Sequence, residues 1–189
     1  LVGEGICYGR YNIAADAQAT LAAAQEFAQY WLDVNGDGVT AGGLQVQLLS
    51  SPLQRCQQLA QALLPLLADA GVCVQMKTEP ALAEMDFGCW EGQSWNALPS
   101  DEWERWMGDF AGYRVGGGES TRAMLQRVHG AAQSTAAQLA ANAQERVIWV
   151  SHAGVICALH WLQSQGCLLR ERQGVQTLQA GNVPVPQIA

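Results

Sequence analysis

The chain is poor in positive charge, in histidine and in long apolar stretches. Only one of its 189 residues is lysine and three are histidine, and its net charge at pH 7 is -7. This balance argues against a broad nucleic-acid-binding surface. No run of roughly 18 apolar residues occurs, so we expect no membrane span. Nine of the ten basic residues are arginine, whose planar fork can hold a small anion inside an acidic protein, although base composition of the gene also explains that excess.

Cysteines in the paired spacing of a metal or redox site are also lacking. The six cysteines lie far apart, and no Cys-x-x-Cys pair occurs among Cys7, Cys56, Cys73, Cys89, Cys157 and Cys167. A zinc site or a disulfide framework is therefore not expected, and we predict no metal and no cofactor. The cysteines are interpreted as reduced core thiols of a cytoplasmic protein.

One stretch, DVNGDGVTAGGL, begins like a calcium-binding loop. Asp33, Asn35 and Asp37 occupy the first, third and fifth places of such a loop. The twelfth place requires a bidentate glutamate, but Leu44 stands there. We therefore predict a glycine-rich surface turn rather than a calcium site.

Short apolar runs alternate along the chain with segments in which apolar residues recur every three to four positions, as on one face of a helix. The spacing of apolar residues predicts helices over 16–32, 52–70, 121–141 and 153–165, and strands over 46–49, 72–76, 147–151 and 175–179. Residues 84–117 are dense in Trp, Gly and charge, and are predicted to form a helical insertion with loops. This order predicts a single α/β domain over 1–189, with a mostly parallel sheet flanked by helices.

Two junctions between a strand and a helix carry groups that suit an anion. In LLSSPLQRC, Ser50 and Ser51 are candidate helix caps, and Arg55 lies in the first helical turn. In WVSHAGV, His152 follows the strand directly. Ligands bind at the carboxyl ends of parallel strands, where free helix amides favour anions. If the two strands are neighbours, Arg55 and His152 meet in a phosphate pocket; the alternatives are a solvated arginine and a structural histidine.

A third segment, LAEMDFGCWEGQSW, places carboxylates among aromatic rings. Glu84, Asp86 and Glu91 lie close in sequence to Phe87 and tryptophan residues. A carboxyl group that is partly desolvated can keep its proton near neutral pH and donate it to a leaving group. The alternative is a structural loop that is covered by aromatic rings and whose carboxylates cap helices.

Taken together, SSPLQRC, LAEMDFGCWEG, GGGES and VSHAGVI, in this order and at these spacings, resemble the histidine phosphatase superfamily with its phosphoglycerate mutase-like fold. GICYGR and EMDFGCWEGQSW are similar to one branch of it, the alpha-ribazole phosphatases of late cobalamin synthesis. The resemblance covers nearly the whole chain. It implies a phosphatase that acts on a small-molecule phosphate ester.

The resemblance implies a role for each matching residue. Arg55 would clamp the phosphoryl oxygens with its planar fork. His152 would bond to the transferring phosphoryl group and stabilise its charge. Glu84 would protonate the leaving oxygen and then activate water, and Arg10 would bind phosphate or substrate at the rim. Asn12 stands where relatives often have aspartate, and the GES motif is interpreted mainly as a helix start near the pocket.

The chain departs from the family pattern at the nucleophile. In the family, a histidine at the end of the first strand attacks phosphorus, about ten residues before the CYGR region. Here no histidine precedes His129, which lies in a predicted helix, and His160 is interpreted as structural. We expect the nucleophile and the first strand to lie upstream of Leu1, in a chain shortened at its N-terminus. The alternatives are a pseudo-phosphatase that binds a phosphorylated ligand without turnover, and a vestigial pocket in a protein kept for an interaction surface.

Two expectations follow from that departure. The missing strand is central in the family's sheet, so its neighbours would expose backbone donors and apolar faces, and the shortened chain would be unstable or prone to aggregation. With the nucleophile present, we expect a two-step phosphomonoesterase that needs no metal, whose substrate is alpha-ribazole 5'-phosphate or its cobalamin-linked form. A broad sugar-phosphate phosphatase is the alternative. Trp90 and Trp95 are candidates for stacking on the base of the substrate.

Overall fold

The computed structural model describes residues 3, 5–40, 44–142, 144–165 and 175–177, and nothing further is said of the others. Its described strands are β1 (Gln45–Ser50), β2 (Cys73–Thr78), β3 (Glu145–Val150) and β4 (Val175–Thr177). They form a parallel sheet in the order β2-β1-β3-β4. The α-helices are α1 (Ala17–Thr40), α2 (Gln54–Asp69), α3 (Ser100–Gly108), α4 (Thr121–Ala141) and α5 (Ala153–Ser164). The predicted parallel α/β fold is confirmed.

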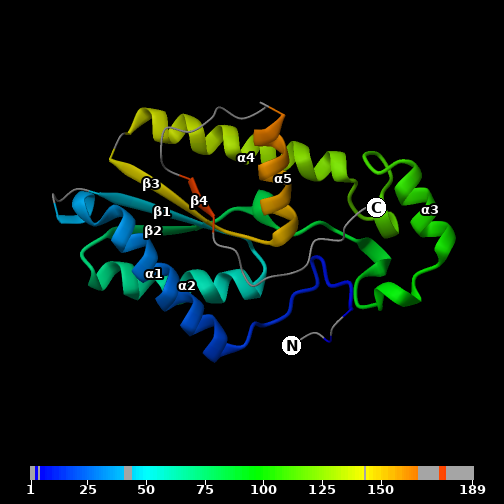
Figure 1. Ribbon diagram of the computed structural model, residues 1–189, viewed down its shortest axis with the longest axis horizontal. Helices are drawn as coiled ribbons and strands as arrows, with labels where there is room; N and C mark the ends of the chain where they lie inside the picture. The colour runs from blue at the N-terminus through cyan, green and yellow to red at the C-terminus, as the bar shows by residue number, and fades with distance from the viewer. Residues whose placement is uncertain (1–2, 4, 41–43, 143, 166–174, 178–189) are drawn as a thin grey trace.

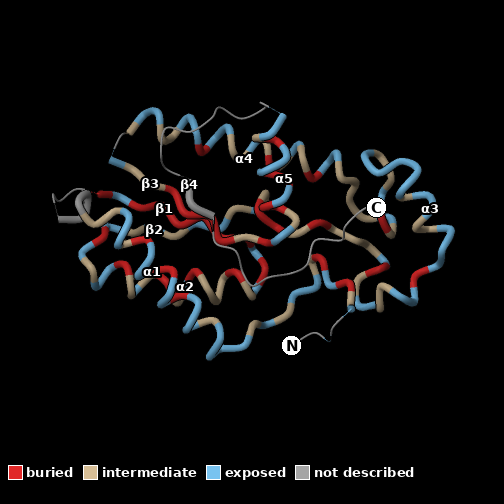
Figure 2. Tube along the Cα trace, viewed as in Figure 1, coloured by how far each residue is buried: buried red, intermediate tan, exposed pale blue. Residues whose placement is uncertain are grey.

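Helices cover both faces of the sheet, with α1 and α2 on one side and α4 and α5 on the other (Figure 1). The buried strands β1 and β3 appear as red tubes at the centre (Figure 2). Leu48 and Ile148 are register partners, have no exposed surface, and pack in the core on the α1 and α2 side. Their neighbours Leu49 and Trp149 belong to the opposite core. Alternate residues of a strand face opposite sides, so these unbroken apolar runs suit a sheet buried on both faces.

The two central strands of the described sheet are direct neighbours. Strands β1 and β3 pair directly with each other from Gln45↔Glu145 to Ser50↔Val150. Strands β1 and β3 therefore satisfy each other's backbone groups along this length. This direct pairing brings the carboxyl ends of β1 and β3, and the residues that follow them, side by side.

The helix α1 is longer than the sequence predicted, and the predicted surface turn after residue 32 is wrong. Helical structure continues to Thr40. Trp31 is buried and accepts a hydrogen bond from Asn35 Nδ2 at 2.8 Å, while Gln29 bonds to Asp33 at 2.8 Å on the exposed side. These bonds between successive turns support helical structure at polar residues that otherwise favour turns.

Residues 84–117 form an irregular lobe beside the sheet, drawn in green at one end of Figure 1. It contains α3 and the 3-10 helices η2 (Gly88–Trp90), η3 (Trp95–Ala97) and η4 (Val115–Gly117); a further 3-10 helix, η1 (Pro80–Leu82), precedes it. Six of its aromatic rings pack in a continuous series, namely Phe87, Trp90, Trp95, Trp103, Trp106 and Phe110. The N-terminal segment crosses this lobe: the Cys7 amide donates to Gln93 O, and Cys7 O accepts from Gly92 N.

Not all cysteines are the core thiols that the sequence predicted. Cys7 and Cys56 are buried, but Cys73, Cys89 and Cys157 are exposed; all five are free thiols, and Cys167 lies outside the described residues. Within the described ranges, no group of three or more His, Cys, Asp or Glu side chains has the arrangement of a metal site. No helix in the same ranges has the length and apolarity that a bilayer crossing requires.

Candidate active site

Arg55 and His152, which the sequence placed at two separate junctions, are in direct contact. Arg55 lies in the first turn of α2, and His152 is the N-cap residue of α5. The Arg55 Nε–H donates a hydrogen bond of 3.2 Å to His152 Nδ1. The contact is possible because β1 and β3 are paired neighbours and both junctions lie at their carboxyl ends.

This contact assigns the protonation state of His152. A guanidinium can only donate, so Nδ1 must carry a lone pair, and the proton of the neutral ring is on Nε2. That nitrogen lies 2.7 Å from Ser51 Oγ and donates a hydrogen bond to it. Burial, and secondarily the charges of Arg55 and Arg127, lower the pKa of His152 to about 3. His152 is therefore a neutral, buried imidazole with a partner on each nitrogen.

The predicted cap of α2 requires a correction, since neither Ser50 nor Ser51 is its N-cap residue. Leu53 occupies that position, with no capping side chain of its own. The Ser51 hydroxyl instead accepts from Leu53 N at 3.3 Å and from His152. Cys56 Sγ lies 3.4 Å from His152 Nε2, and burial raises the pKa of this thiol to about 12, so it stays protonated.

The N-terminal segment wraps around the Arg55 guanidinium. Nη2 donates to Gly9 O at 2.8 Å, and Nη1 donates to Tyr11 O at 3.0 Å. The guanidinium carbon also lies 5.1 Å from the centre of the Tyr8 ring, within the range of a cation–π contact. Of the five N–H donors of Arg55, three therefore have protein partners and two remain for a further acceptor.

Glu84 lies against the same helix that His152 caps. Its Oε2 accepts a hydrogen bond of 3.2 Å from Gly154 N in the first turn of α5, and its Oε1 accepts one of 2.9 Å from Met85 N. Burial raises the pKa of Glu84, although these two bonds and the Arg55 and Arg127 charges oppose the shift. The three predicted side chains are thus brought together around the start of α5.

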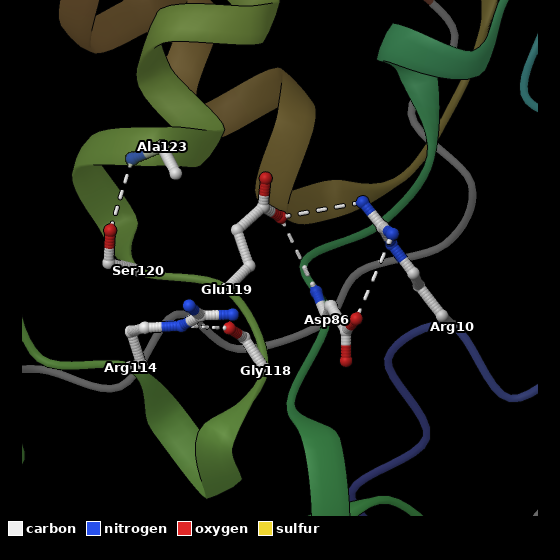
Figure 3. A pocket seen from close by; sticks show the side chains of 7 residues that line it. All are labelled: Arg10, Asp86, Arg114, Gly118, Glu119, Ser120 and Ala123. Carbon is white, nitrogen blue, oxygen red and sulfur yellow. Dashed lines mark hydrogen bonds and ion pairs between the residues drawn. The ribbon is translucent and has the colours of Figure 1, made fainter.

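Arg10 connects Glu84 to an adjacent cavity. Its Nε donates to Glu84 O at 3.1 Å, and its terminal nitrogens lie 3.8 Å from Asp86 Oδ2 and 3.7 Å from Glu119 Oε2. Figure 3 shows Arg10 beside these carboxylates, with Arg114 across the cavity. The cavity has a volume of about 420 Å³ and is lined by Arg10, Asp86, Arg114, Gly118, Glu119, Ser120 and Ala123. Arg55, Glu84 and His152 do not line it, so the hydrogen-bonded pair and the cavity are neighbours rather than one hollow.

Arg127 is a residue of this region that sequence reasoning missed. It donates two bonds of 2.8 and 2.9 Å to the Glu119 carboxylate, and further bonds to backbone carbonyls of residues 81–84. Glu119 precedes the Ser120 N-cap and Arg127 lies within α4, so no helical spacing in the sequence pointed to this pair. The GES motif does begin α4, because Ser120 Oγ accepts from Ala123 N at 3.2 Å.

Other sequence candidates are placed away from these groups. His129 lies within α4, as predicted, and His160 is exposed on α5. Trp90 is only 2% exposed and packs against other rings, so its predicted stacking on a substrate base is wrong. Trp95 is partly exposed, but it packs against Phe87 and Trp103 in the same cluster.

The family model of the histidine phosphatase superfamily (branch 1) matches residues 16–174. The chain belongs to this family. Members of the histidine phosphatase superfamily are usually phosphatases or mutases. The resemblance inferred from the sequence motifs is confirmed at this level.

Solved structures support the same fold. The alpha-ribazole phosphatase from Shigella flexneri is 24% identical, with a TM-score of 0.60 over 85% of this chain and 71% of that one. The mycobacterial hydrolase 2 is 22% identical, with a TM-score of 0.58 over 85% of this chain and 65% of that one. The comparison with curated protein sequences gave no match. At these identities, the likeness establishes the histidine phosphatase fold.

Proposed function

We propose that this chain holds the phosphoryl group and supplies the acid of a phosphomonoesterase that acts on a small phosphate ester in the cytoplasm. The observation that carries the proposal is the Arg55–His152 contact at the ends of two paired parallel strands, with the Glu84 carboxyl at the same helix start. The free thiols at the surface fit a reducing compartment.

The proposed reaction has two steps. A histidine upstream of Leu1 attacks phosphorus, so that an N–P bond forms while the ester P–O bond breaks. Arg55 holds the phosphoryl oxygens with its two remaining N–H donors, and Glu84 gives its proton to the leaving alcohol. Water then attacks phosphorus and gives a proton to the Glu84 carboxylate, and the N–P bond breaks.

In this mechanism His152 is an electrostatic donor and not the nucleophile. In the proposed complex its Nε2–H donates to a phosphoryl oxygen in place of Ser51 Oγ. A neutral imidazole suits this role, because it can donate from one nitrogen and accept at the other. The lowered pKa of His152 keeps it neutral throughout the physiological range. No metal ion is required by these steps.

Among substrates, we propose alpha-ribazole 5'-phosphate or its cobalamin-linked form. The alpha-ribazole phosphatase among the structural neighbours supports this choice. The cavity beyond Arg10 contains both arginine and carboxylate side chains, which suit a hydroxyl-rich leaving group. A broad sugar-phosphate phosphatase is the alternative for the same site.

Two assays test the proposal. The first measures binding of inorganic phosphate to the 189-residue chain by calorimetry, for wild type, Arg55→Gln and Arg122→Gln. Arg122 is exposed on α4 and is the matched control. Loss of a charge-assisted hydrogen bond should weaken binding about 10- to 100-fold in Arg55→Gln only. Equal binding by all three proteins contradicts the assigned role of Arg55.

The second assay measures release of phosphate from alpha-ribazole 5'-phosphate, ribose 5-phosphate and p-nitrophenyl phosphate. It compares the 189-residue chain with a chain that also includes the residues encoded upstream. We expect turnover only in the longer protein, with alpha-ribazole 5'-phosphate preferred. Equal rates on all three esters indicate the broad phosphatase.

A phosphate-binding protein without turnover is the second candidate. The observation that favours it is that the only histidine in contact with Arg55 already has protein partners on both nitrogens, in the part of the chain that the structure describes. Phosphate binding by the longer protein, with no hydrolysis of any of the three esters, would support this candidate.

A further inference from the structure

The backbone of Glu84 is held by two arginines from different parts of the fold. Arg10 Nε donates to Glu84 O at 3.1 Å, and Arg127 Nη2 donates to the same oxygen at 3.2 Å. A carbonyl oxygen has two lone pairs, so both acceptor positions are used. The position of the Glu84 main chain is therefore determined by the N-terminal segment on one side and by α4 on the other.

Every N–H donor of the Arg127 guanidinium has a partner in the protein. Its Nη1 donates to Ala81 O and to Ala83 O, each at 2.7 Å, so with the bonds to Glu84 and Glu119 all five N–H donors are used. The side chains of Arg127 and Glu119 are only 17% and 12% exposed. One guanidinium thus attaches the whole loop from Ala81 to Glu84 to a single point on α4.

The same arginine affects the charge of Glu84. Burial raises the pKa of the Glu84 carboxyl, and the positive charge of Arg127 opposes this shift. The other groups around Glu84 are Arg55 and the Cys56 thiol from α2, Arg10 from the N-terminal segment, the Met85 amide, and the Gly154 amide of α5. Glu119 pairs with Arg127 and lies 3.7 Å from Arg10, so it reduces the positive field that Glu84 experiences.

We propose that Arg127 is the positioning residue for Glu84, and that Glu119 holds Arg127 in place. Arg127 fixes the carboxyl of Glu84 against the first turn of α5, where Gly154 N donates to it. The role as an acid rests on the proposed function, whereas the placement of Glu84 by Arg127 can be tested without turnover. A side chain held this way loses little conformational freedom when a substrate binds.

The test is an NMR titration of the 189-residue chain. Side-chain carboxyl carbons of labelled glutamate are followed with pH, and the Glu84 signal is assigned by its loss in Glu84→Gln. The Gly154 amide is followed in parallel, because its bond to Glu84 Oε2 makes its chemical shift report the same titration. The variants are Arg127→Gln, Arg127→Lys and Glu119→Gln, with Arg122→Gln on the same helix as control.

The expected shifts differ in sign among the variants. In Arg127→Gln the pKa of Glu84 rises further, because an opposing positive charge is lost; in Glu119→Gln it falls, because Arg127 and Arg10 are no longer partly neutralised. In Arg127→Lys the charge remains but the fork is lost, so the Gly154 amide ceases to follow Glu84. Arg122→Gln resembles wild type in both signals.

Thermal melts show which variants fold cooperatively. Arg127→Gln removes the nearest charged partner of Glu119, so Arg127→Lys and Glu119→Gln keep the test available if that variant is unfolded. A folded Arg127→Lys protein whose Gly154 amide follows Glu84 as in wild type overturns the proposal. So does a Glu84 pKa that Glu119→Gln leaves unchanged or raises. Neither result depends on phosphatase activity. The placement of Glu84 by Arg127 can therefore be disproved while the proposed phosphatase function stands, and the reverse also holds.

Discussion

The Arg55 guanidinium donates a hydrogen bond to His152 Nδ1 at 3.2 Å, although 97 positions separate the two residues. The contact joins the first turn of α2 to the N-cap of α5, beyond the carboxyl ends of the paired strands β1 and β3. Because Arg55 can only donate, the contact also requires a neutral imidazole. One interaction therefore relates the sheet order, the protonation state of His152 and the orientation of an anion-binding side chain.

His152 should make the folded protein sensitive to acid. Its pKa is lowered to about 3 in the folded state, so the unfolded chain takes up the proton first as pH falls below about 6.5. The stability that His152 contributes is complete above that pH and is lost toward pH 3, by about 1.4 kcal/mol for each pH unit. Urea unfolding of wild type and His152→Gln at several pH values measures this difference. A difference that does not change between pH 7.5 and 4.5 contradicts the prediction.

Two glycines should respond in opposite ways to alanine substitution. Gly88 has φ of +54°, and a Cβ there would collide with the backbone of Gly116 and Gly118, where η2 and η4 cross. We expect Gly88→Ala to lose about 2 kcal/mol or more of stability. Gly130 lies exposed in α4 with open space around it, so Gly130→Ala should gain about 0.5–1 kcal/mol. Denaturant midpoints compare the two, and a loss in Gly130→Ala would show that its site is more crowded than described.

Asn12 should act as a cap of α2 from outside the helix. Its Oδ1 accepts a hydrogen bond of 2.7 Å from Gln54 N, the first residue of α2. Asn12→Ala should lose about 1 kcal/mol of stability, as other lost caps do. Asn12→Asp keeps the acceptor and adds a charge that the helix start favours, so it should be at least as stable as wild type. Equal destabilisation by both substitutions, measured by thermal unfolding, argues against the capping role.

The five described cysteines should divide into two groups by reactivity. Burial raises the pKa of both Cys7 and Cys56 to about 12, which leaves little thiolate at neutral pH. Cys73, Cys89 and Cys157 are exposed. Brief treatment of the native protein with iodoacetamide, followed by peptide mapping, should find label on the exposed three and not on Cys7 or Cys56. Label on Cys56 at a comparable rate would show that its thiol is accessible.

Much of the fold was predictable because local patterns specify local structure. The helix over Thr121–Ala141 was predicted at its observed bounds, since a serine cap precedes it and its apolar residues follow the helical period. The extension of α1 past Leu32 was not predictable from composition, because Asp, Asn and Gly favour turns when considered alone. Its bonds to Trp31 and Gln29 depend on the helix already being formed.

The candidate site was predicted in part. Arg55, Glu84, His152 and Arg10 were identified from motif resemblance, and the structure brings their elements together. The groups that hydrogen-bond to these side chains or their backbone were not identified from the sequence. Ser51, Arg127 and the carbonyls of Gly9 and Tyr11 have no distinctive spacing along the chain. Long-range hydrogen bonds leave no periodic signal, unlike the packing of an apolar helix face.

The sequence by itself determined which segments are helices and strands, which faces are apolar, and which family the motifs resemble, since these depend on the order and spacing of neighbouring residues. Only the tertiary structure decided that β1 pairs with β3, that His152 is neutral with its proton on Nε2, and that Arg127 holds the Glu84 backbone. Those outcomes depend on which distant groups share a small volume from which water is removed, and burial there decides both the pKa values and the choice of partner.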